Sequence, residues 1–128
     1  MRRINSYRLT GVIDAAGALV VSTSADQSAP RGRVIAVEVD YPAGTVALTL
    51  TSKNLAVTQT IMNLSAANTD AIYYPRVPVC LNTGAETIYY STTAKVYEPY
   101  MVFGHLTMTA ASGTAAQVVS MIVYVEEY

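Results

Sequence analysis

Apolar and polar residues alternate along most of this chain, the pattern of β-strands with one dry and one wet face. The clearest alternation runs from Arg33 to Ser52, with a turn at Tyr41-Pro42-Ala43-Gly44. We interpret this stretch as a β-hairpin. Its dry faces are predicted to consist of Ile35, Val37 and Val39 on the first strand and Val46, Leu48 and Leu50 on the second.

Shorter runs of the same kind predict further strands on both sides of that hairpin. They cover residues 4–13, 18–23, 57–62, 86–90, 101–110 and 116–126, with polar loops at 24–32 and 63–69. The last run differs from the others, because Val118, Ile122 and Tyr124 make its second face partly apolar as well. A strand that is apolar on both faces lies centrally in a sandwich or at a contact between subunits.

The pattern predicts one fold class for the whole chain. Eight or nine short strands, with turn signals every ten or so residues and no helical periodicity, are typical of an all-β antiparallel sandwich. A jelly roll suits this number of strands best. No linker or repeat divides residues 1–128, so we expect a single domain, with residues 1–5 as a possible N-terminal arm.

One segment, DAIYYPRVPVCL (Asp70 to Leu81), departs from regular alternation. Pro75 and Pro78 cannot donate hydrogen bonds to a neighbouring strand, so this segment belongs at a sheet edge or is broken there. We considered it as a ligand site and as an irregular edge that meets a partner protein. The rest of the chain favours the edge, because it supplies no base, metal set or phosphate loop.

Composition narrows the function classes. Charged residues make up 13% of the chain and the net charge is −1, so the basic excess of a nucleic-acid-binding protein is missing. A surface with so few charges is either neutral through Ser and Thr or covered by other subunits. No apolar run reaches the roughly 20 residues of a membrane helix, so we expect no membrane association.

The residues that carry enzyme chemistry are few. Glu38 and Asp40 share a wet face but have no third ligand or histidine beside them. His105, the one histidine, lies on the same face of its predicted strand as Thr107 and Thr109. Cys80, the one cysteine, follows two valines closely and is expected to be a small buried residue. We therefore expect no catalytic residue, metal or cofactor, and no enzyme.

Tyrosine is the unusual residue here, with 10 in the chain against one Phe and no Trp. A tyrosine ring offers an apolar face and a hydroxyl, which suits protein interfaces and partly wet pockets. Stacking on sugar rings is the alternative, although nearby Asp and Asn are scarce. The predicted partner interface consists of Tyr73, Tyr74, Arg76, Tyr89, Tyr90, Tyr97, Tyr100, Ile122 and Tyr124.

Residues 60–128 resemble the small jelly-roll cement or decoration proteins of tailed bacteriophage capsids. The resemblance rests on NTDAIYYPRVPV, on NTGAE and on the closing pair GHLTMTAASG and VVSMIVYVEEY. It implies a non-enzymatic virion protein on the capsid surface, assembled in the host cytoplasm. The implied partners are the major capsid protein and further copies of the chain, typically as a homotrimer. The alternative is a carbohydrate- or receptor-binding module of a tail fibre or spike.

Overall fold

The computed structural model describes residues 2–23, 29–41, 44–53, 57–67, 69–78 and 97–127. In these ranges the chain forms β-strands and no helix, which confirms the predicted all-β class. The strands are β1 (Arg3–Val12), β2 (Leu19–Ser22), β3 (Gly32–Asp40), β4 (Val46–Lys53), β5 (Thr58–Ala67), β6 (Ala71–Tyr73), β7 (Arg76–Pro78), β8 (Tyr97–Pro99), β9 (Met101–Val102), β10 (Leu106–Ala111) and β11 (Val118–Glu127).

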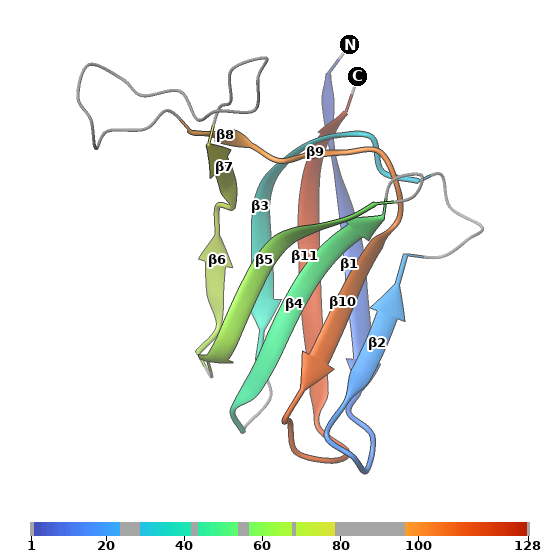
Figure 1. Cartoon of the computed structure of the whole chain (residues 1–128), viewed down its shortest axis with the longest axis vertical. Helices are drawn as coiled ribbons and strands as arrows, with labels where there is room; N and C mark the ends of the chain where they lie inside the picture. Colours follow the sequence, from blue (N-terminus) through green and yellow to red (C-terminus); the bar gives the residue numbers. More distant parts are fainter. Residues whose placement is uncertain are drawn as a thin grey trace.

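Two antiparallel sheets pack face to face as a sandwich (Figure 1). Sheet A has the strand order β1-β11-β3-β6, with β9 also paired to β3, and sheet B has the order β2-β10-β4-β5. Sheet B lies in front in Figure 1, and a separate ribbon of β7 and β8 projects beside the upper end of the sandwich. The predicted β-sandwich is therefore confirmed.

The strand order is that of a jelly roll. When β7, β8 and β9 are set aside, sheet A contains the first, eighth, third and sixth of the remaining strands, and sheet B the second, seventh, fourth and fifth. The chain thus crosses between the sheets at nearly every connection, and β4 and β5 form its one hairpin within a sheet among these strands. Two interleaved Greek keys of this kind define the jelly-roll architecture.

The core lies between the sheets and follows the alternation read from the sequence. Leu48 and Leu50 of β4 are fully buried, as are Val37 of β3 and Val123 of β11. Each fully buried aliphatic side chain contributes roughly 1.5–3 kcal/mol through loss of apolar surface from water. Other large core residues include Leu9, Ile13, Val34, Val39, Val46, Val102, Leu106, Met108 and Met121.

Backbone hydrogen bonds close the lower end of the sandwich, where the turns after β1 and β10 meet (Figure 1). The Asp14 carboxylate accepts hydrogen bonds from the backbone N–H groups of Ala16 and Ala18 and shapes the first turn. The Gly113 N–H then donates to the Gly17 carbonyl at 3.0 Å, which joins the two turns. These contacts hold the connection between the predicted strands at residues 4–13 and 18–23.

The expected hairpin from Arg33 to Ser52 is wrong. β3 pairs with β11, β6 and β9 in sheet A, whereas β4 pairs with β10 and β5 in sheet B. The dry faces of β3 and β4 meet across the core instead of lying side by side in one sheet. Alternation shows which face of a strand is buried, and it is satisfied equally by a neighbour in the sheet and by a strand of the opposite sheet.

A β-bulge overturns the predicted face of Ile35. Tyr124 of β11 pairs with Ala36 while the next residue, Val125, pairs with Val34, so Ile35 is the extra residue on β3. The insertion shifts the parity by one, and Val34 is fully buried in place of Ile35, which is half-buried. A bulge has this effect because two residues of one strand oppose a single residue of its partner.

Two other elements differ in extent from the sequence prediction. The expected loop at residues 63–69 is strand as far as Ala67, because Leu64 continues the pairing with Leu48 while Asn63 and Ser65 occupy the exposed face. The expected strand from 101 to 110 is broken, since β9 pairs in sheet A and β10 in sheet B. The predicted strand at residues 86–90 lies outside the described residues.

Candidate partner-binding site

The outer face of sheet A carries cross-strand rows of side chains set by the strand register. One row runs from Arg8 on β1 to Ile122 on β11, then to Glu38 on β3 and Ile72 on β6. Ile72 is 54% exposed, and Ile122 is half-buried. Apolar and charged side chains therefore alternate across this face, an arrangement suited to a polar contact with an apolar centre.

Tyr124 lies on the same face, two residues after Ile122 on β11. Its hydroxyl donates a hydrogen bond to Glu38 Oε2 at 3.1 Å, diagonally across β11 and β3. The hydrogen bond to the Glu38 carboxylate, followed by desolvation, raises the pKa of Tyr124 above its ordinary value. The half-buried ring is thereby held over the strands, so a partner loses little side-chain entropy by packing on it.

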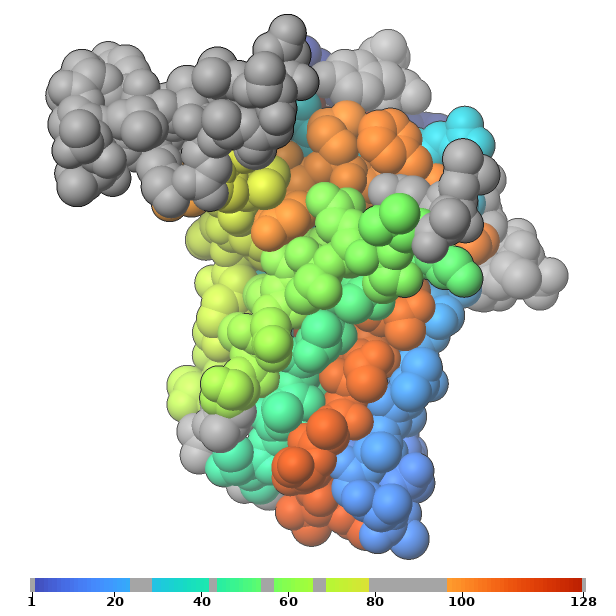
Figure 2. Space-filling model, viewed as in Figure 1, coloured from blue at the N-terminus to red at the C-terminus, as the bar shows by residue number. Residues whose placement is uncertain are grey.

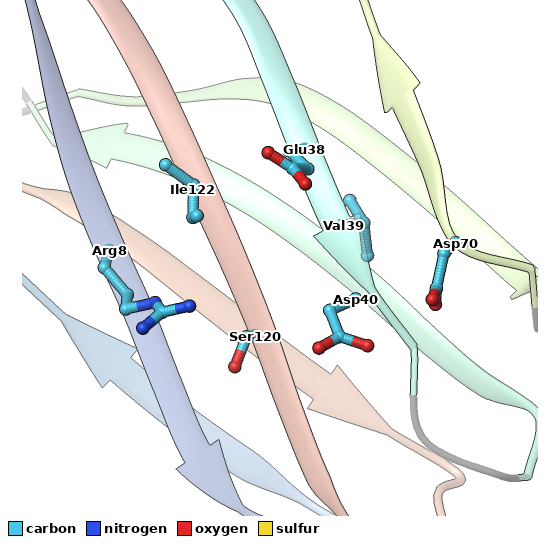
Figure 3. A pocket seen from close by; sticks show the side chains of 7 residues that line it. All are labelled: Arg8, Glu38, Val39, Asp40, Asp70, Ser120 and Ile122. Atoms are coloured by element: carbon cyan, nitrogen blue, oxygen red, sulfur yellow. The ribbon is translucent and has the colours of Figure 1, made fainter.

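A depression of about 210 Å³ opens on the same face (Figure 3). Glu38, Asp40 and Asp70 contribute carboxylates on one side, and the Arg8 guanidinium extends from β1 on the other. The remaining lining residues are Val39, Ser120 and Ile122. Three carboxylates against one guanidinium leave this surface acidic, so it favours a cationic group such as a lysine or arginine side chain.

The carboxylates in the depression are not equally available. Asp70 accepts a hydrogen bond from the backbone N–H of Tyr41 at 2.8 Å, and Glu38 accepts the one from Tyr124. Within the described ranges, no hydrogen bond or ion pair engages the side chain of Asp40 or the guanidinium of Arg8. Asp40 is thus the carboxylate most open to a partner.

The tyrosine-rich segment places its rings in two different environments. Tyr73, on β6, points inward and packs against the core next to Tyr41, and burial, followed by the neighbouring Tyr73 hydroxyl, raises the pKa of Tyr41. Tyr74 follows directly and is 63% exposed. Arg76 is also exposed, with its guanidinium donating to the Pro75 carbonyl at 2.8 Å.

The ribbon of β7 and β8 carries the next tyrosine. Pro78 pairs with Tyr97 and Arg76 pairs with Pro99, and the Tyr97 ring is 56% exposed. Tyr100 differs from it, because its ring packs against the core and its carbonyl accepts a hydrogen bond from the Val34 N–H at 2.9 Å. Among the described tyrosines of the predicted set, Tyr74 and Tyr97 are therefore the exposed rings, and Tyr73 and Tyr100 stabilise the fold.

Sequence reasoning missed part of this surface. Arg8, Asp70 and Ile72 were not among the predicted contact residues, and they join the site only through the register of β1, β11, β3 and β6. Parity along each strand indicates their outward direction, but nothing local indicates which strands are neighbours. Tyr89, Tyr90 and Cys80 lie outside the described residues.

His105 lies in a separate cluster from the carboxylates Glu38 and Asp40. His105 Nδ1 is 2.8 Å from Thr23 Oγ1, and Thr23 Oγ1 also accepts the Leu106 N–H at 3.2 Å. This cluster lies at the opposite sheet from Glu38 and Asp40. In the part of the chain that the structure covers, no group of three His, Cys, Asp or Glu side chains is arranged to hold a metal ion. No helix long and apolar enough to span a membrane occurs in the same ranges.

The geometry thus gathers an exposed aromatic edge (Tyr74, Arg76 and Tyr97), an acidic depression (Arg8, Glu38, Asp40 and Asp70) and the ring of Tyr124 on or beside sheet A. This arrangement has the residue types of a protein-binding surface. Comparisons of the chain with protein-family models, with curated proteins and with solved structures find no match.

Proposed function

We propose that this protein is a non-enzymatic structural protein of a virion, which binds neighbouring subunits of the major capsid protein and stabilises the capsid. The observation that carries the proposal is the exposed aromatic edge, where Tyr74 and Tyr97 are 63% and 56% exposed on either side of Arg76. Tyrosine and arginine are the side chains that most often dominate the binding energy of protein interfaces.

The β7–β8 ribbon supports the same proposal. It has two strands of three residues each and forms a sheet of its own outside the sandwich. An isolated two-stranded ribbon is at best marginally stable in water. A partner surface that packs on the exposed rings adds the buried area that the ribbon lacks.

The acidic depression indicates which charge the partner carries in the proposed contact and how the partner is oriented. Asp40 and Asp70 favour a cationic side chain from the capsid subunit, and Arg8 on the far side fixes its orientation by repulsion. Such a charged contact sets register and association rate more than affinity. We therefore assign the affinity to the tyrosine edge and the register to the depression.

The test is co-sedimentation with capsids that lack this protein. We expect saturable binding and a rise in the temperature at which the capsids disrupt. Absence of both binding and heat protection overturns the proposal. The alternative, a carbohydrate- or receptor-binding module, predicts instead that a glycan binds and that Tyr74→Ala abolishes this binding.

A further inference from the structure

We propose that the outer edge of β5 is a self-association surface, at which a second copy of the chain pairs antiparallel about a two-fold axis. β5 is the last strand of sheet B, and no strand of the described ranges pairs with its outer side. Figure 2 shows the front of β5 (light green) uncovered by other described segments, with the yellow atoms of β6 and β7 and the orange atoms after β8 seen beyond its outer side. This inference does not depend on capsid binding.

The four edge strands of the sandwich differ in how they resist pairing. β1 places Arg3 and Arg8 at exposed positions, β2 has four residues, and β6 has three residues and is followed two positions later by Pro75. Charged residues, short strands and proline are the features by which proteins prevent edges from pairing with other chains. Three of the four edges are therefore protected.

β5 lacks these features. Its ten residues, TQTIMNLSAA, include no charged residue, no proline and no glycine. A long uncharged edge of this kind is a template for another strand, because its outward N–H and C=O groups have no partner in the sheet. Its exposed side chains are Thr58, Thr60, Asn63 and Ser65, which are all small and polar.

Two irregularities in the pairing of β5 with β4 limit where a partner strand fits. They leave two regular stretches, Thr58 to Thr60 opposite Lys53 to Thr51, and Met62 to Leu64 opposite Leu50 to Leu48. An antiparallel pair centred on Asn63 uses the second stretch. The two Asn63 side chains then oppose each other, and Met62 of each copy opposes Leu64 of the other.

A second copy suits this edge for reasons of charge. In a two-fold pair β5 meets a second β5, so charge-free positions face charge-free positions and no like charges meet. The outer face of sheet B next to Asn63 is uncharged too, formed by Thr49 and Thr51 of β4 and Thr107 and Thr109 of β10, and the exposed Lys53 lies at the far end of β4, opposite Thr58. The contact therefore predicts a dimer, or an assembly of dimers, where the family resemblance implies a trimer.

The experiment uses opposite charges at one position. Asn63→Lys and Asn63→Glu each place two like charges against each other in the pair, and each variant alone should weaken dimerisation about tenfold or more. An equimolar mixture of the two variants should restore dimers as mixed pairs. Ser6→Lys, an exposed residue on the β1 edge, is the matched control. Sedimentation velocity at micromolar concentration measures the species.

The expected result is a dimeric wild-type protein, monomeric Asn63 variants, restored dimers in their mixture and an unchanged Ser6→Lys variant. A monomeric or trimeric wild-type protein overturns the inference, as does a mixture that stays monomeric. Capsid binding is measured separately on the same samples. Binding by a monomeric wild-type protein contradicts only the β5 pair, whereas a dimer that fails to bind capsids contradicts only the proposed function.

Discussion

The hydroxyl of Tyr7 donates a hydrogen bond to Glu127 Oε1 at 2.6 Å, which joins the first strand of the chain to the last. The Asn5 amide donates to the other carboxylate oxygen of Glu127, and the Arg31 N–H donates to Oε1 at 3.3 Å. These donors converge at the end of the sandwich where both termini lie (Figure 1). Glu127 therefore connects β1, β11 and the residue before β3.

Acid should weaken this connection. Burial alone would raise the pKa of Glu127, but hydrogen bonds from Tyr7, Asn5 and Arg31 outweigh it and hold the pKa below its ordinary value of 4.5. A carboxyl group whose pKa is lower in the folded state stabilises the fold above its unfolded pKa, and this contribution is lost as the pH falls through the folded value. We expect the urea midpoint to fall below pH 4.5, and Glu127→Gln to reduce that fall. An equal fall in both proteins would contradict this role.

Alkaline pH should destabilise the fold through Tyr7, the hydrogen-bond donor to Glu127. Burial, then the hydrogen bond and charge of Glu127, raise the pKa of Tyr7 from 10.0 to about 12. A group whose pKa is raised on folding stabilises the fold below its unfolded pKa, and that stability is lost as the pH rises from 10 towards 12. Tyr7→Phe should lower stability by about 1 kcal/mol at neutral pH and remove this alkaline step.

Urea unfolding followed by circular dichroism checks the Tyr7→Phe prediction. Tyr124→Phe is the matched control, because that hydroxyl also bonds a carboxylate but at an exposed position. The control should lose less stability than Tyr7→Phe, because water replaces a hydrogen bond lost at an exposed position. Equal losses in the two variants would show that the connection to Glu127 has no special role.

Gly17 should resist substitution. Its φ angle is +80°, and a Cβ atom there would lie 2.7 Å from the Gly113 carbonyl oxygen, in the turn to which Gly17 is hydrogen-bonded. Because the obstacle is backbone, Gly17→Ala should cost about 1–3 kcal/mol. Gly44→Ala is the control, since a Cβ atom there meets the side chain of Thr114, which can rotate. Thermal unfolding that shows equal losses would contradict the argument.

Asp70 should be replaceable by asparagine but not by alanine. Its Oδ1 atom accepts the Tyr41 N–H at 2.8 Å, and this bond ties the start of β6 to the end of β3. Asp70→Ala should destabilise the protein by about 1–2 kcal/mol through loss of that acceptor. Asp70→Asn keeps an acceptor oxygen and should retain most of the stability, measured by urea unfolding. A stable alanine variant would contradict this assignment.

The sequence predicted which side chains are buried better than which strands are neighbours. Leu48 and Leu50 were assigned to the dry face and are fully buried, because alternation reports burial directly. The same alternation led to a hairpin of residues 33–52 that does not exist, since the dry faces of β3 and β4 meet across the core. Pairing depends on long-range contacts, which no local pattern encodes.

Tyr73 and Tyr74 also show that the strand order decides what the local sequence does not. Tyr73 and Tyr74 are adjacent on an extended segment, so their rings must point to opposite sides. Both rings were assigned to the partner interface from the sequence, but the position of β6 beside β3 turns Tyr73 inward and leaves Tyr74 exposed. The acidic depression was beyond sequence reasoning, because Arg8 and Asp70 are brought together only by the strand order.

The most direct test of the proposed function compares capsid binding by wild-type protein and by the Tyr74→Ala, Tyr97→Ala double variant. Both rings are mostly exposed, so the variant should fold normally, and Val20→Ala on the outer face of sheet B is the matched control. We predict that the double variant binds undecorated capsids about thirtyfold or more weakly, with the control unchanged. Equal binding by the double variant and wild type would contradict the assignment of the exposed aromatic edge as the binding surface.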